Sequence, residues 1–132
     1  GGTYTATASA SKYDVTLDNQ GGSANSTISA TFDAAMPTVK KPTKNYTVSF
    51  DSNGGSAVSS QSASQTFGGY YTGTNGSGTQ YYKADGTSAR NWDKTTATTL
   101  YAKWSNSSIK LPSTSRSGYT FIGWYDGDNK VG

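Results

Sequence analysis

Short stretches of alternating apolar and polar residues recur along this chain. Residues 13–17 have the order Tyr-x-Val-x-Leu, and residues 46–50 have the order Tyr-x-Val-x-Phe. A period of two places the apolar side chains on one face of a β-strand. A Gly-Gly pair follows each stretch, at 21–22 and at 54–55, and glycine supplies the positive φ angles of a tight turn. The pattern therefore predicts two strands, each ending in a turn.

These two stretches belong to longer segments that occur twice in the chain. Residues 13–23 (YDVTLDNQGGS) correspond to residues 46–56 (YTVSFDSNGGS). A second element, in which small residues stand beside large rings, occurs at 66–73 (TFGGYYTG) and again at 120–127 (TFIGWYDG). Both copies of this element are also predicted to be strands. The repetition indicates two copies of one structural unit.

Two further elements extend the pattern. A proline-stiffened approach to a strand occurs at 41–44 and at 111–114. Residues 99–104 (TLYAKW) are predicted to form a strand that is seen once in full. Residues 2–7 (GTYTAT) are expected to be its weak counterpart.

The composition favours strands over helices. All eight acidic residues are Asp, so the chain lacks Glu, a strong helix former, and is rich in a residue that favours turns. Only 32% of residues are hydrophobic, and 13% are aromatic, so the core must be built from rings with scattered Val, Ile and Leu. Rings placed within alternating patterns are untypical of disordered chains. We expect a mainly β fold with little helix, in which residues 88–92 hold a single helical turn.

Three motifs together resemble the Listeria–Bacteroides repeat, a family that includes the B repeat of internalin B. They are Y-x-V-x-F-D-x-N-G-G at 46–55, P-x-x-x-x-x-G-Y-T-F-x-G-W-Y at 112–125 and L-Y-A-K-W at 100–104. The resemblance implies small β-grasp-like units that occur in tandem on bacterial surface proteins.

The order of the elements departs from that of the family, because the two copies are interleaved. Residues 1–12 are expected to be an N-terminal strand or linker, and 13–104 the first repeat unit, with the opening strand of the second, 46–65, inserted. Residues 105–132 are then the truncated remainder of the second unit. Exchanged strands, an engineered sequence or joined segments would each give this order. The last strand of the second unit is either missing or supplied by residues 3–8, which would leave an edge open to a neighbouring module or chain.

Charge and residue types argue against several classes of function. The net charge of +3 is spread along the chain without a dense basic run, so nucleic acid is not an expected partner. The chain has no Cys and no His, which leaves acid–base catalysis to Asp, Lys or Tyr. Asp18 and Asp51 precede the predicted turns, where Asp is expected to form local hydrogen bonds. We expect no enzyme activity and no cofactor, and no apolar run is long enough for direct membrane insertion.

One segment has a partial calcium-loop pattern. Asp126, Asp128 and Asn129 lie close together, but Lys130 follows them and no later acidic residue could complete the ligand shell. The preferred interpretation is an exposed hairpin turn, and no metal site is expected.

Aromatic residues give the best binding hypothesis. Exposed rings can stack on sugars or anchor a protein partner, and a glycine-rich region holds five candidates for such a ligand platform: Tyr70, Tyr71, Tyr81, Tyr82 and Trp92. The preferred alternative is that these rings pack in the core, since adjacent tyrosines in a strand point to opposite faces. Trp104, Phe121 and Trp124 are assigned to the core.

The sequence thus predicts a non-catalytic module of a bacterial secreted or cell-surface protein, located outside the cell or in the cell wall. It would act as a stalk or spacer, or as a weak adhesive domain. Its partners would be neighbouring repeats or domains of the parent protein, or a host surface protein or glycan. The alternative is a carbohydrate-binding module of a secreted enzyme that uses exposed Tyr and Trp side chains.

Overall fold

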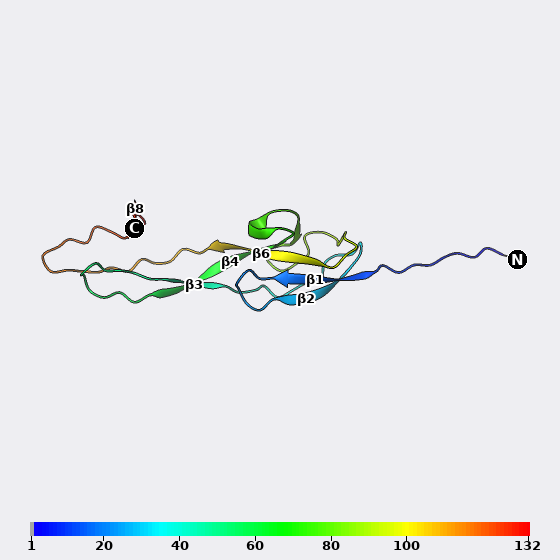
Figure 1. Ribbon diagram of the computed structural model, residues 1–132, viewed down its shortest axis with the longest axis horizontal. Helices are drawn as coiled ribbons and strands as arrows, with labels where there is room; N and C mark the ends of the chain where they lie inside the picture. Colours follow the sequence, from blue (N-terminus) through cyan, green and yellow to red (C-terminus); the bar gives the residue numbers. More distant parts are fainter. Residues whose placement is uncertain (1) are drawn as a thin grey trace. The chain divides into compact units, whose positions relative to one another are not determined.

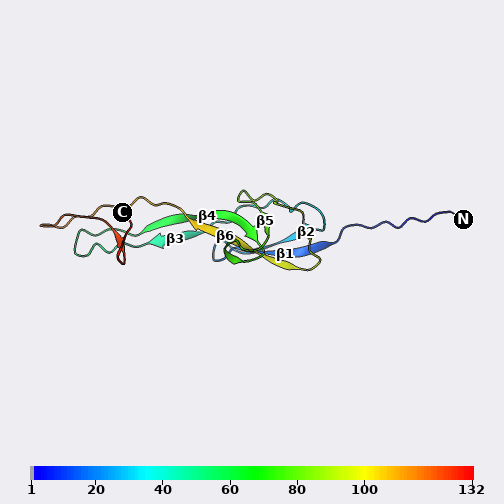
Figure 2. The same ribbon diagram turned by 90° about the horizontal axis from the view of Figure 1, so that it is seen from above.

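The computed structural model describes residues 2–132 and is mainly β, which confirms the predicted fold class (Figures 1 and 2). Its elements are β1 (Lys12–Asp18), β2 (Ser26–Thr31), β3 (Asn45–Val48), β4 (Gln61–Tyr71), the 3₁₀ turn η1 (Thr74–Gly76), β5 (Gln80–Tyr82), β6 (Thr98–Asn106), β7 (Tyr125–Asp126) and β8 (Asn129–Lys130).

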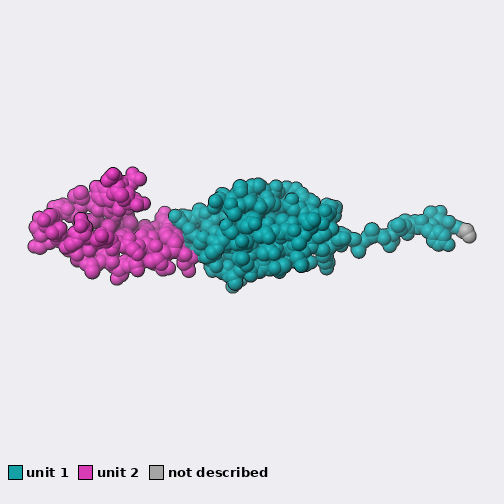
Figure 3. All heavy atoms as spheres, viewed as in Figure 1, with its two compact units in different colours: residues 1–44, 65–106 teal, residues 45–64, 107–132 magenta. Residues whose placement is uncertain are grey.

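The chain forms two compact units, each built from two separate segments and coloured separately in Figure 3. Unit 1 comprises the residues up to Lys44 together with Gln65–Asn106, and unit 2 comprises Asn45–Ser64 together with Ser107–Gly132. The long strand β4 contributes its first residues, 61–64, to unit 2 and the remainder to unit 1. Segments of the two units therefore alternate along the sequence.

The sheet of unit 1 is organised around β6. On one side β6 pairs in parallel with β1, with Leu100 opposite Leu17, and on the other side it pairs antiparallel with β4. β2 extends the sheet beyond β1, and β5 pairs with β4. Val15 and Leu17 are buried, so the alternating pattern of the first strand does place its apolar residues on one buried face.

A bulge in β4 brings β5 close to the sheet. The pairing register of β4 shifts between Phe67 and Tyr70, where the chain carries two glycines. Gly69 has a φ of +105°, and a Cβ atom there would lie 2.2 Å from the backbone oxygen of Tyr82. Only glycine fits this position, because a side chain would be both strained and in collision with β5. The bulge thereby sets the placement of the buried rings on β5.

The two Gly-Gly turns have the same construction. In unit 1, Gln20 and Gly21 have φ angles of +50° and +83°, and in unit 2, Asn53 and Gly54 have +48° and +84°. The Oδ1 atom of the preceding Asp18 or Asp51 accepts the backbone N–H of Gln20 or Asn53, at 2.9 Å in each case. The predicted local hydrogen bonding of these two aspartates is confirmed.

Unit 2 contains fewer strands than the sequence predicts. β3 pairs antiparallel with the first residues of β4, but of the predicted strand at 120–127 only Tyr125–Asp126 forms a ladder, with Asn129–Lys130. The prediction fails because the backbone of Trp124 forms hydrogen bonds with the C-terminal residues and not with a sheet. Its N–H donates to Gly132 O at 2.5 Å, and its carbonyl accepts from Val131 N at 2.8 Å. The hairpin turn predicted at 126–129 is confirmed.

Two other strand or helix elements that the sequence suggests do not form. Residues 2–11 form no strand, so they do not supply a last strand to either unit; Gly1 lies outside the described residues. Residues 88–92 are not helical, because they form β-bridges instead: Ser88 with the nearby Tyr82, and Asn91 and Trp92 with Ala35 and Phe32, which are distant in the sequence. The short helical turn occurs instead at η1.

The core of unit 1 depends on aromatic packing. Trp92 exposes 0% of its surface and contacts the Tyr81 ring at a centroid distance of 5.0 Å. We predict that Trp92→Ala lowers the free energy of unfolding by about 3–5 kcal/mol, because truncation of a buried indole leaves a large cavity. Urea denaturation followed by circular dichroism measures the change. The control Tyr4→Ala, at a residue that is 98% exposed, should change stability by less than about 0.5 kcal/mol; equal losses in both variants would contradict the prediction.

Candidate binding site in unit 2

The structure places most of the candidate platform residues inside unit 1. Tyr70, Tyr81, Tyr82 and Trp92 are each exposed by 2% or less, and only Tyr71 is half-buried. The two tyrosines of β5 point to opposite faces, but both faces are covered. Tyr81 packs on Trp92, and Tyr82 packs edge-on against Tyr70 with centroids 5.6 Å apart. These four buried rings present no surface to a sugar and instead form the core, which was the alternative interpretation.

The hydroxyl groups of the buried tyrosines all have partners within the protein. Tyr70 Oη donates to Asn19 Oδ1 at 2.5 Å, and Tyr82 Oη donates to Pro37 O at 2.7 Å. Burial raises the pKa of Tyr70 and of Tyr81 to about 12, and it raises the pKa of Tyr82 further still. The phenols are therefore held neutral, which is the opposite of what a tyrosine nucleophile or general base requires.

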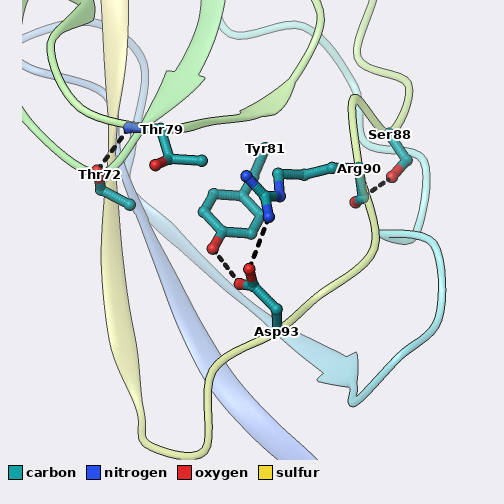
Figure 4. Close-up of polar contacts among 6 residues, drawn as sticks. All are labelled: Thr72, Thr79, Tyr81, Ser88, Arg90 and Asp93. Carbon is teal, nitrogen blue, oxygen red and sulfur yellow. Dashed lines mark hydrogen bonds and ion pairs between the residues drawn. The ribbon is translucent and has the colours of Figure 1, made fainter.

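A polar cluster of Tyr81, Arg90 and Asp93 holds the loop that follows β5 against this core (Figure 4). Tyr81 Oη donates to Asp93 Oδ1, and Arg90 Nη2 lies 2.7 Å from Asp93 Oδ2. The Arg90 guanidinium also lies 5.3 Å from the centroid of the Tyr81 ring. The hydrogen bond from Tyr81 is the largest cause that lowers the pKa of Asp93, with Arg90 adding to it. The cluster anchors a loop to the core, and nothing in its arrangement prepares a group for proton transfer.

Unit 2, by contrast, has an accessible cavity of about 330 Å³. Its walls are the Gly-Gly turn at 51–55, the segment 114–116 and the aromatic segment 119–125. The aromatic segment is much less buried than the corresponding part of unit 1, with Tyr119 67%, Phe121 40% and Ile122 68% exposed. The assignment of Phe121 to the core is therefore wrong, whereas Trp104 and Trp124 are partly buried.

The aromatic wall of the cavity is held in place by ring contacts. Trp124 packs against Phe50 at 4.9 Å and against Phe121 at 5.4 Å between ring centroids. Its Nε1 donates to Pro112 O at 2.8 Å. The Arg116 guanidinium lies 4.1 Å from the Tyr119 ring centroid, within range of a cation–π contact. Exposed rings on an ordered wall can accept an apolar or aromatic group from a partner.

The turn at this cavity matches the turn of unit 1 in its backbone bonds. Gly22 N donates to Asn19 O at 2.9 Å in unit 1, and Gly55 N donates to Ser52 O at 2.9 Å in unit 2. The correspondence makes Ser52 the counterpart of Asn19 and Gly55 the counterpart of Gly22.

The segment after the proline docks on the turn in the same way in both units. Ser23 N donates to Thr43 O at 2.7 Å, and Ser56 N donates to Ser115 O at 2.7 Å. The return bonds also agree, because Thr43 N donates to Ser23 Oγ and Ser115 N donates to Ser56 Oγ, both at 3.1 Å. The two units thus share a two-way bonded contact between turn and proline segment.

A cation follows this contact in each unit. Lys44 Nζ donates to Gln20 O at 2.8 Å, and Arg116 Nη1 donates to Asn53 O at 3.5 Å. The cation therefore binds a carbonyl at the tip of each turn.

The aromatic segments correspond as well. Phe67 packs against Tyr70 with centroids 5.0 Å apart in unit 1, and Phe121 packs against Trp124 in unit 2. Within the described residues, however, unit 2 contains no counterpart of β6. The cavity therefore lies in a unit that repeats the turn and the aromatic wall of unit 1 without the strand that covers them there.

The described residues hold no grouping of three or more Asp, Glu, His or Cys side chains suited to a metal ion. No helix in that part of the chain has the length and apolar character needed to cross a membrane.

The model of the Listeria-Bacteroides repeat domain matches the chain over two segments, residues 46–66 and 104–131. Those segments contain most of unit 2, including the turn and the aromatic wall of its cavity. No curated protein and no solved structure matches the chain.

Ionisation of the buried tyrosines should unfold unit 1 at high pH. The folded protein retains the protons of Tyr70 and Tyr81 up to a pKa of about 12, whereas the unfolded chain loses them near pH 10. The folded state binds more protons in this interval, so stability falls as the pH rises from about 10 to about 12, by roughly 2–3 kcal/mol for each tyrosine. Urea denaturation at a series of pH values measures this slope.

Tyr70→Phe separates the effect of ionisation from that of packing. The variant starts less stable near neutral pH because it loses the bond to Asn19, but it should lose less stability than the parent between pH 10 and pH 12. An unchanged slope would show that ionisation of this tyrosine does not drive the alkaline transition.

Proposed function

We propose that this chain, which carries a Listeria-Bacteroides repeat domain, is a non-catalytic interaction module of a bacterial surface protein and makes contact with neighbouring modules through the cavity of unit 2. The repeat match supports a domain of bacterial surface proteins. A stalk or adhesive role outside the cell is our extension of that match.

The observation that carries the proposal is the exposure of apolar side chains around an ordered cavity. Tyr119, Phe121, Ile122 and Tyr125 are each 40% or more exposed, and all four line the cavity of unit 2. A contiguous apolar patch on a folded surface is typical of sites that bind a protein partner. A partner that buried these side chains would stabilise the complex by about 25 cal/mol for each Å² of apolar surface removed from water.

Unit 1 supports a structural role in a different way. The largest rings of its core, Tyr70, Tyr81, Tyr82 and Trp92, are buried, and Tyr81 also takes part in the polar cluster that anchors a loop. The carbohydrate-binding alternative relies on five rings, and this unit buries four of them. Among the described residues, the apolar wall of unit 2 is open to a partner.

An apolar fluorescent dye tests whether the patch is accessible in the folded protein. We expect dye fluorescence to rise on addition of the chain and to fall several-fold in the double variant Phe121→Ser and Ile122→Ser, because both side chains line the cavity. The matched control is Val131→Ser, since Val131 is 56% exposed in the same unit but does not line the cavity. Circular dichroism checks that each variant is folded. Equal dye binding by the double variant and the parent would refute the proposal.

A further inference from the structure

Unit 1 contains a cavity of its own, with a volume of about 500 Å³. All of its lining residues belong to unit 1, and they come from the segments 17–19, 23–26 and 39–43 and from Tyr70. Leu17, Asn19 and Tyr70 are each exposed by 3% or less, and they form the floor of the cavity. A cavity of this size lies in the range that small ligands occupy in proteins.

Hydrogen bonds hold the walls of this cavity in place. Asn19 Nδ2 on the floor donates to Ser23 O in one wall at 3.0 Å. In a second wall, Val39 N donates to Gly86 O at 3.0 Å, and Thr43 is bonded in both directions to Ser23. Walls that are fixed before a ligand arrives lower the conformational entropy that binding costs.

The charge at the cavity is positive. Lys40 and Lys41 are its only charged lining residues, and both are exposed. Within residues 2–132 neither ammonium group forms a hydrogen bond or an ion pair, since the one ion pair there joins Arg90 and Asp93. A lysine ammonium group binds a carboxylate or a phosphate as a point charge. Two adjacent lysines without an acidic partner therefore favour a ligand with an anionic group.

Hydroxyl groups supply further polar contacts at the cavity. Ser23, Ser26 and Thr43 line it, and Ser23 Oγ accepts the backbone N–H of Thr43, which leaves its own proton able to donate. In the described part of the chain, the hydroxyls of Ser26 and Thr43 form no hydrogen bond. Tyr70 Oη donates to Asn19 Oδ1, so its lone pairs can still accept. Groups that both donate and accept are suited to the hydroxyls of a sugar.

The cavity also has a small apolar surface. Leu17 lies on the floor, and the half-buried Val39 lies in a wall. A simple inorganic ion would leave both side chains in contact with water, whereas the C–H groups of a sugar ring can cover them. The lining therefore favours an organic anion.

We propose that the cavity of unit 1 binds an anionic sugar, a ring with several hydroxyl groups and one carboxylate or phosphate. The anionic group contacts the two lysine ammonium groups, and the sugar hydroxyls bond to the serine and threonine side chains. The C–H groups of the ring pack on the leucine and the valine. This inference goes beyond the proposed function, because it concerns another unit, other residues and another chemical class of ligand.

Titration of the isotope-labelled full chain, followed by nuclear magnetic resonance, tests the proposal. The probes are glucuronate, glucose 6-phosphate and glucose, which share one ring and differ in charge. We expect at least one anionic sugar to shift the amide signals of 23–26 and 39–43 saturably, and to bind about tenfold or more tightly than glucose, because a charged partner strengthens a hydrogen bond. The tighter of the two identifies the anionic group as a carboxylate or a phosphate. If neither binds better than glucose, the proposal is wrong.

Acetate and inorganic phosphate supply the charge without the ring. We expect both ions to bind more weakly than the anionic sugar, because they make no contact with the hydroxyl groups or the apolar surface. Binding of either ion as tight as that of the sugar would show an adventitious ion only and would overturn the proposal.

Two double variants with the same change in net charge locate the ligand. Lys40→Gln with Lys41→Gln should weaken binding of the anionic sugar about tenfold or more, because both charged contacts are lost. The control, Lys12→Gln with Lys83→Gln, changes two exposed residues of the same unit that do not line the cavity. It should weaken binding less than about twofold, since salt screens distant charges. Equal losses would show that net charge attracts the ligand, and would overturn the proposal.

The outcome is independent of the dye experiment on unit 2. Dye binding without sugar binding would overturn this inference and leave the proposed function intact. Sugar binding without dye binding would support this inference and refute the proposed function.

Discussion

The fold of unit 1 depends on one long-range contact, the seating of the Trp104 indole on the first Gly-Gly turn. The contact joins residues 85 positions apart in the sequence, through the bond from Trp104 Nε1 to Asn19 O. It fixes the end of β6, which in turn holds β1 on one side and β4 on the other. Glycine is required at position 22 because a Cβ atom there would lie 2.7 Å from Thr43 O and 3.0 Å from the indole atom Cζ2. A local turn and a distant strand are therefore specified together.

The buried tyrosines depend on the same arrangement. Asn19, which accepts the indole N–H through its backbone, also accepts the Tyr70 hydroxyl through its side chain. Its own amide nitrogen donates to the carbonyls of Ser23 and Ala24, at 3.0 Å each. A single buried amide thus links the turn, the aromatic core and β6, and every polar group in the link has a partner. Such satisfaction is what makes a polar group tolerable inside a small core.

Local features of the fold could be predicted from the sequence because short-range chemistry decides them. The alternation at 13–17 fixes a strand, and Asp18 with Gly21 fixes the turn that follows, without reference to the rest of the chain. The mainly β class followed from the same patterns. The segment at 120–127 could not be predicted in this way, because its residues suit a strand but lack a neighbouring strand with which to pair. β-Propensity describes fit to a half-buried sheet and not an intrinsic state of the backbone.

The candidate site was missed for a related reason. The glycine-rich region around the rings at 70–71, 81–82 and 92 favours an exposed platform, yet the bulge at Gly69 brings β5 against the sheet and buries four of these rings. The alternating pattern also favours a buried Phe121, but burial of the corresponding Phe67 involves a ring from another strand, Trp104. The signal that could have identified the site was the strand motif that occurs only once in full, at 99–104.

The two units have the same turn but differ in the burial of their aromatic residues. Both turns have the same positive φ angles, the same aspartate bond and the same docking of the proline segment, so these features do not need β6 in order to form. Burial of the aromatic wall does need it: Phe67 is 4% exposed beneath β6, and Phe121 is 40% exposed without such a strand. The turn and the docking of the proline segment are thus specified by nearby residues, whereas burial of the aromatic wall in unit 1 depends on a strand distant in the sequence.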